Sequence, residues 1–172
     1  MLANVPAGIA FLRASLARLR GDAALAAGYD RQALAQLGED DWLLRSFVRW
    51  NLAVVDWLHG RLGPAERGLA EVLAERRAAG EAFGGFLPMR ARHDLGEVQR
   101  AQGNLDAAAA TYRQALDTAD ESSQAALMGP AHVGLAQVLY ERDELTAALD
   151  HATRGVTLCQ QLAFTEIGRA HV

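Results

Sequence analysis

The stretch Leu95-Gly96-Glu97-Val98-Gln99-Arg100-Ala101-Gln102-Gly103-Asn104-Leu105, followed by Ala108, Tyr112 and Ala115-Leu116, decides how the rest of the chain is interpreted. Apolar and small residues recur at helical spacing on both sides of Gly103. Glycine tolerates the left-handed conformation at a helix end, and a following Asn or Asp can cap the next helix. The stretch therefore predicts two helices joined by a tight turn, with small residues where the helices touch.

The same kind of turn recurs along the chain about every 40 residues. It stands at Gly21, Gly60 and Gly103, and in a cognate form at Asp143. A small residue or Val follows each turn at two fixed offsets, in the pairs Ala26 and Ala33, Ala65 and Val72, Ala108 and Ala115, Ala148 and Gly155. Looser breaks alternate with the tight turns, near residues 38–41, 80–85 and 120–123 and at Gly129-Pro130. We therefore expect four helical hairpins in series, at about 5–37, 41–79, 86–120 and 130–163.

Composition supports an all-α fold and excludes several function classes. Ala and Leu dominate, and no stretch alternates β-branched or aromatic residues with polar ones. The 17 basic residues are all Arg and stand against 21 acidic ones, so direct nucleic-acid binding by this chain is not expected. No apolar run approaches the ~20 residues of a membrane span. With a single cysteine, Cys159, a cytoplasmic location is expected.

The quoted residues resemble a known repeat. The tetratricopeptide repeat (TPR) pattern resembles the arrangement of Leu95-Gly96, Gly103, Ala108, Tyr112 and Ala115-Leu116. The last hairpin matches the same pattern less closely. The lengthened, Ala- and Arg-rich form, especially over 95–105 and 131–142, is similar to the TPR region of MalT-like, LuxR-family bacterial transcriptional regulators. The resemblance covers about residues 5–166 and implies a TPR-like right-handed superhelix of helical hairpins.

The resemblance also implies a function. In that family an ATPase module with a P-loop precedes the TPR superhelix and a helix-turn-helix domain follows it. The sequence has no GxxxxGK[ST] motif and no Lys. We therefore expect a fragment of a larger regulator, namely the sensor segment that binds an effector or partner protein. The alternatives are a stand-alone TPR adaptor that binds a peptide and, from another class, a catalytic helical-repeat protein.

No catalytic or cofactor-binding constellation is recognisable. The histidines show no HExxH or other compact ligand spacing, and the best pair, His93 with Glu97, lacks a third ligand nearby. The alternative to a metal site is that this pair simply lies on a solvated helix face or a groove wall. No serine stands in a GxSxG context. We expect neither an enzyme nor a bound cofactor or metal.

The resemblance places the binding surface in a concave groove lined by the first helix of each hairpin, where a protein, a peptide or a small effector would bind. Carried over position by position, the groove residues are Phe11, Ser15 and Arg18 in the first hairpin; Phe47, Trp50, Val54 and Trp57 in the second; Arg90, His93, Glu97 and Arg100 in the third; Val133, Gln137 and Tyr140 in the fourth. Trp50 and Trp57 either contact a ligand or pack between adjacent helices. Without Lys the usual carboxylate-clamp pattern is absent, although Arg can still grip a carboxylate.

The two ends of the chain give two further expectations. The terminal repeats expose apolar faces, which favours self-association. Residues 167–172, Ile-Gly-Arg-Ala-His-Val, look like the translation of a short sequencing adapter, so the repeat domain is expected over 1–166 and the last six residues are expected to be foreign to the natural protein. The alternative is a genuine frayed terminus.

Overall fold

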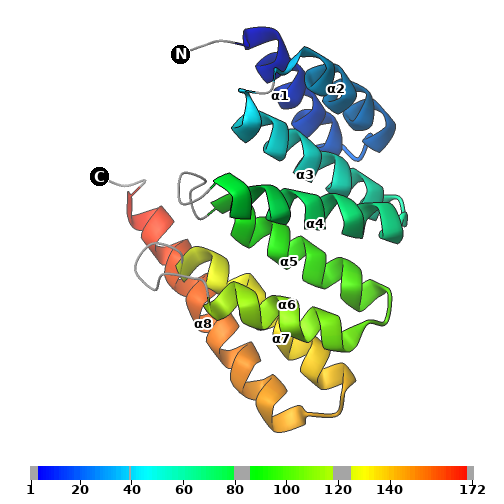
Figure 1. Cartoon of the computed structure of the whole chain (residues 1–172). Helices are drawn as coiled ribbons and strands as arrows, with labels where there is room; N and C mark the ends of the chain where they lie inside the picture. The colour runs from blue at the N-terminus through cyan, green and yellow to red at the C-terminus, as the bar shows by residue number, and fades with distance from the viewer. Residues whose placement is uncertain (1–3, 39, 80–85, 118–124, 170–172) are drawn as a thin grey trace. The chain divides into compact units, whose positions relative to one another are not determined.

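A computed structural model describes residues 4–38, 40–79, 86–117 and 125–169, with only the backbone described for 76–79, 125–127 and 162–169. All regular structure in these ranges is helical (Figure 1), so the all-α prediction is confirmed for the described residues. The helices there are α1 Val5–Leu19, α2 Ala23–Gln36, α3 Trp42–Leu58, α4 Leu62–Ala79, α5 Phe86–Ala101, α6 Leu105–Asp117, α7 Ala125–Glu141 and α8 Leu145–Arg169. The chain forms two compact units, Met1–Phe83 with α1 to α4 and Gly84–Val172 with α5 to α8.

The four tight turns share one backbone geometry. Gly21, Gly60 and Gly103 have positive φ angles of 78°, 71° and 79°, and Asp143 follows them at 62°. In each turn the next residue's N–H donates to a carbonyl five residues back, as from Asn104 to Gln99 at 2.9 Å. This bond satisfies a carbonyl that the end of the helix leaves free. The turns therefore fold each helix pair into an antiparallel hairpin (Figure 1).

The core of the first unit is built from small residues. Ala7, Ala10, Ala33 and Val48 form one buried cluster of α1, α2 and α3. A second cluster contains the buried side chains of Ala17, Ala26, Ala27 and Val55. Alanine at these positions lets helix axes approach closely, as the offsets after each turn predict.

The core of the second unit surrounds Tyr112 of α6. Its side chain is fully buried with Ala108, Ala115, Leu135 and Val138. Gly96 of α5 and Gly134 of α7 face its ring so closely that an added Cβ would lie 2.6 Å and 2.4 Å from the ring carbon Cζ, respectively. The two glycines therefore make room for one aromatic side chain among three helices.

Two predicted boundaries are wrong. Gly129-Pro130 is no break, because α7 begins at Ala125 and contains Pro130. The helix continues through this residue because its neighbours pack: a Cβ on Gly129 would meet the Cys159 sulfur at 2.6 Å, and Ala131 is buried. The last helix extends past the expected end at 163, through Arg169. The foreign origin of residues 167–172 stays a prediction, and the looser breaks predicted near 80–85 and 120–123 lie outside the described residues.

Candidate partner-binding surface

Two pairs of predicted groove residues lie against each other across α1 and α3, the first helices of the two hairpins in the first unit. The rings of Phe11 and Phe47 are tilted, with centroids 6.2 Å apart. The Arg18 guanidinium lies over the Trp50 ring at 5.6 Å from the centroid, within the range of a cation–π interaction. The structure thus brings together side chains that stand more than one helix apart in the sequence.

A series of hydrogen bonds leads from Arg18 into the core. The Nε of Arg18 donates to Asn51 Oδ1 at 2.5 Å, and Asn51 Nδ2 donates to Asp30 Oδ2 at 2.7 Å. Asp30 is fully buried, and burial raises the pKa of its carboxyl to about 7 although Asn51 and Arg18 act in the opposite direction. This carboxylate was not among the residues predicted from the sequence. The available signal was its place between Ala26 and Ala33, on the buried face of α2.

Three of the predicted groove residues in α3 differ in how far solvent can reach them. Trp50 and Trp57 are half-buried. Val54 is only 4% exposed. Its place in the groove is therefore a wrong prediction, because its apolar side chain packs inside the molecule. For the two tryptophans, partial burial fits packing between helices, while the accessible part of each ring remains available to a ligand.

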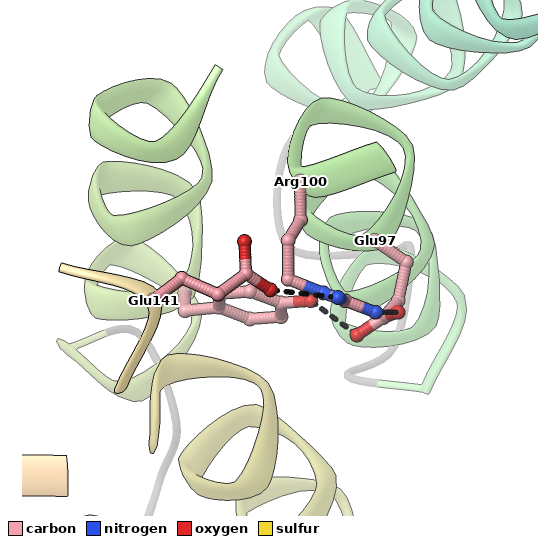
Figure 2. A network of polar contacts seen from close by, with 4 residues as sticks. Glu97, Arg100 and Glu141 are labelled. Carbon is pink, nitrogen blue, oxygen red and sulfur yellow. Dashed lines mark hydrogen bonds and ion pairs between the residues drawn. The ribbon is translucent and has the colours of Figure 1, made fainter. Parts of the chain in front are cut away.

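In the second unit a charged network crosses from α5 to α7 (Figure 2). Arg100 donates to Glu97 Oε2 and to Glu141 Oε1, both at 3.0 Å. The Tyr112 hydroxyl donates to the other Glu97 oxygen at 2.6 Å. Burial alone would raise the pKa of Glu97, but Tyr112 and Arg100 hold that pKa below its ordinary value. The predicted groove residues Glu97 and Arg100 are thus joined by Glu141, which was not among the predicted groove residues.

The other two predicted groove residues of α5, Arg90 and His93, also contact neighbouring side chains. Arg90 pairs with the buried carboxylate of Asp94 at 3.2 Å. The His93 ring lies 6.0 Å from the Tyr112 ring, centroid to centroid, and burial lowers the pKa of His93. Because both Arg90 and Arg100 already carry carboxylate partners, gripping a ligand carboxylate here requires displacing an existing pair.

A hollow of about 570 Å³ opens beside this network, between α7 and α8. Four predicted groove residues line it, namely Arg100, Val133, Gln137 and Tyr140. Gln137 is exposed, and Tyr140 is 69% exposed. The rest of the lining includes Ala136, Leu145, Ala148, Leu149 and Ala152. Glu141 completes the lining, so the hollow combines an apolar floor with amide, hydroxyl, guanidinium and carboxylate groups at its edge, a composition suited to recognition.

In the described part of the chain, no three His, Cys, Asp or Glu side chains are grouped so that they could hold a metal ion. Likewise, none of the described helices is both long enough and apolar enough for a bilayer span.

Comparison with known proteins identifies the family. The model of the MalT-like TPR region matches residues 7–170. Among solved structures, the chain is similar to the crystal structure of BtubC (BKLC) from P. vanneervenii, with a TM-score of 0.76 and 17% identity. That match covers 91% of this chain and 64% of BtubC, and at this identity it shows a shared TPR-like helical-repeat fold. No curated protein matches significantly. The chain belongs to the MalT-like TPR region family.

Proposed function

We propose that this chain is a non-catalytic scaffold that binds a protein, a peptide or a small effector along the first helices of its hairpins. We further propose that it serves in the cytoplasm as the sensor segment of a MalT-like, LuxR-family, ATP-dependent transcriptional regulator. The match of the MalT-like TPR region over residues 7–170 supports both parts. The observation that carries the binding role is the hollow bordered by four groove residues of α5 and α7.

The chemistry of the hollow favours a particular class of ligand group. Val133, Ala136 and Ala148 offer an apolar floor, so an apolar group gains by leaving water there. Gln137 supplies both an amide donor and an acceptor at the edge, and Tyr140 supplies a hydroxyl. The Arg100 charge is offset by Glu97 and Glu141. We therefore expect a neutral or cationic ligand group with an apolar body, and not a free anion.

The binding role can be tested with random linear peptides displayed on phage and with a panel of neutral small metabolites measured by thermal shift. Any selected peptide or metabolite should bind the wild-type chain at least about tenfold more tightly than Gln137→Ala or Tyr140→Ala, a loss of about 1.4 kcal/mol, because the first variant removes the amide donor and acceptor and the second removes an aromatic contact and a hydroxyl. Gln160→Ala, an exposed glutamine elsewhere on α8, is the matched control.

Equal affinity of all the variants would contradict binding at this surface. Selection of acidic peptides alone would contradict the charge argument.

A further inference from the structure

Two fully buried polar side chains in the first unit hold one arginine at its surface. Asp30 of α2 and Asn51 of α3 are inaccessible to solvent. The Asn51 amide donates to Asp30 Oδ2 and accepts from Arg18 Nε of α1. Replacing such a buried pair by apolar side chains of the same shape is nearly neutral for stability in many proteins. The pair therefore points to a role beyond packing, which is to fix the position of Arg18.

The Arg18 guanidinium is held at two places and keeps two donors free. Its Nε is bound to Asn51, and its central carbon lies 5.6 Å from the centroid of the Trp50 ring. Among the described residues, no acceptor is bound to its two terminal nitrogens, and the residue is only half-buried. Arg90 and Arg100 of the second unit, by contrast, carry carboxylate partners. Arg18 is therefore a positioned cation with unused hydrogen-bond donors.

The charges around Arg18 favour an anionic ligand. The helix α1 contains no acidic residue. Two acidic side chains of α3 and α4 are already paired, namely Asp56 with Arg61 and Glu75 with Arg49. Asp40 and Asp41 lie at the far end of the helices, since Asp41 accepts from Asn4, which is about 20 Å along α1 from Arg18. The positive charge of Arg18 is therefore offset only by the buried Asp30, and only while that carboxyl is ionised.

An apolar surface adjoins Arg18 on the same face of α1. Phe11, Ser15 and Arg18 follow this face at helical spacing. The Phe11 ring lies against that of Phe47 of α3 and is about 10 Å along the helix from Arg18. Ser15 stands between them and has a hydroxyl donor. The contacts of this face are with α3, inside the unit, so the face does not depend on what precedes α1 in the chain.

We propose that Arg18 binds the carboxylate of a small ligand with an apolar body, and that Asn51 and Asp30 are its positioning residues. A carboxylate fits because its two oxygens match two parallel N–H donors of one guanidinium. Its single negative charge also matches a single free cation. The apolar body lies on the accessible parts of the Trp50 and Phe11 rings, where it leaves water. This site extends the proposed binding role from the second unit to the first.

Asp30 gives this site a pH dependence that packing alone does not produce. Its Oδ1 is buried without a hydrogen-bond partner in the described part of the chain, so it can hold a proton while Oδ2 still accepts from Asn51. Arg18 therefore stays in place in both charge states of Asp30. The charged group that acts on Asp30 is Arg18 from α1, whereas α3 faces it with the neutral Asn51 and α2 with Ala26 and Ala33.

The direction of the pH dependence follows from the charge of Asp30. Burial raises the pKa of this carboxyl to about 7. Above that pH Asp30 is ionised, and its charge offsets that of Arg18 and repels a bound carboxylate. Below it Asp30 is neutral and the Arg18 charge is uncompensated. The affinity for a carboxylate should therefore rise as pH falls from 8 to 6, and by linkage a bound carboxylate should raise the pKa of Asp30.

An NMR titration of the 172-residue chain with 3-phenylpropionate, followed at the tryptophan indole N–H signals, tests the inference. The Trp50 signal, assigned by its loss in Trp50→Phe, should shift, whereas 3-phenylpropanamide, the same body without the charge, should leave it in place. Arg18→Gln should weaken binding on the order of tenfold or more. Arg13→Gln is the matched control, because Arg13 also lies over an aromatic ring, that of Tyr29 at 6.0 Å, but packs on α2 instead of α3. That variant should bind like the wild type.

The same titration at several pH values tests the role of Asp30. Between pH 6 and pH 8 the probe stays ionised, and its affinity for the wild type should fall on the order of threefold or more. Asp30→Asn keeps an acceptor for Asn51 but carries no charge, so its affinity should stay at the high value across this range. A pH dependence that persists in Asp30→Asn, or none in the wild type, would overturn the role of Asp30.

Other outcomes decide the site itself. An unmoved Trp50 signal, equal shifts with the amide, or unchanged binding by Arg18→Gln would overturn it, with far-UV circular dichroism checking that each variant remains helical. Binding of a peptide through its free C-terminal carboxylate, without binding of 3-phenylpropionate, would overturn the assignment to a small ligand. The proposed function fails separately, because Gln137 and Tyr140 line the hollow of the second unit and their variants leave Arg18 intact.

Discussion

The substitution Gly134→Ala tests the packing on which the second unit depends. The new Cβ would lie 2.4 Å from Cζ of Tyr112, well inside van der Waals contact. The ring has little room to retreat, since Gly96 lies against it as well, with an added Cβ there only 2.6 Å from Cζ. Its hydroxyl is also held by the 2.6 Å hydrogen bond to Glu97. A single methyl group must therefore shift a helix or strain the ring.

Two opposing effects set the magnitude. Replacing Gly by Ala inside a helix stabilises it by about 1 kcal/mol, whereas overpacking a tight core costs about 1–3 kcal/mol and occasionally more. At this separation the steric term is expected at or above the upper end, for a net loss of about 2 kcal/mol in the free energy of unfolding. Gly28→Ala in α2 is the matched control, because its added Cβ meets no atom within 4 Å. That variant keeps only the propensity gain and should be more stable by up to about 1 kcal/mol.

Urea unfolding followed by circular dichroism measures both variants. The expected result is opposite signs, with a difference of about 3 kcal/mol between the two free energies of unfolding. If Gly134→Ala is as stable as Gly28→Ala, Tyr112 does not fill the space between the three helices, and the assigned packing is wrong.

Three further outcomes follow from the same structure. Ala115→Arg should lose on the order of 1–3 kcal/mol or more, because Ala115 is fully buried in a helix seam, whereas Ala110→Arg at an exposed position should stay within about 0.5 kcal/mol of the wild type in thermal melts. Asp30→Asn should gain stability relative to the wild type as pH rises from 4 to 7. Burial raises the pKa of Asp30 to about 7, so over most of that range the unfolded wild-type chain has released this proton while the folded protein still holds it, which favours unfolding of the wild type; parallel pH profiles of the two proteins would argue against this. The Nδ1 atoms of His132 and His151 lie 2.8 Å apart, and burial lowers the pKa of both rings. The free energy of unfolding should therefore fall as pH drops below about 6.5, because the unfolded chain then binds protons more readily than the folded one. His132→Gln should make this fall less steep in urea titrations at different pH values.

Local patterns predicted those parts of the fold that depend on backbone geometry. The left-handed turns could be predicted because glycine marks three of them, and the stretch Arg142-Asp143-Glu144 indicated the fourth by its similarity to them and its spacing of 40 residues from Gly103. The small residues after each turn were found for the same reason, because their offset from the turn is constant. The break predicted at Gly129-Pro130 was wrong. A proline usually ends a helix, but α7 continues through Pro130, where Gly129 packs closely against Cys159 of α8.

The candidate surface was harder to predict because its partners come from separate helices. The pairing of Arg100 with Glu141 joins α5 to α7, and helical spacing within either one does not reveal it. Val54 was misplaced because a stripe at helical spacing identifies one face of a helix without saying whether another element covers that face. The buried Asp30 carboxylate was not predicted, because its hydrogen-bond partner Asn51 lies on another helix, α3.

Sequencing the source DNA across the coding region tests the proposed regulator most directly. The account predicts one continuous reading frame that encodes a P-loop ATPase module before these repeats and a helix-turn-helix domain after them, diverging from the present sequence near Glu166 and continuing into further repeats. In-frame stop codons immediately outside the 172 residues, with neither module present, would contradict the sensor-segment role and favour a stand-alone adaptor.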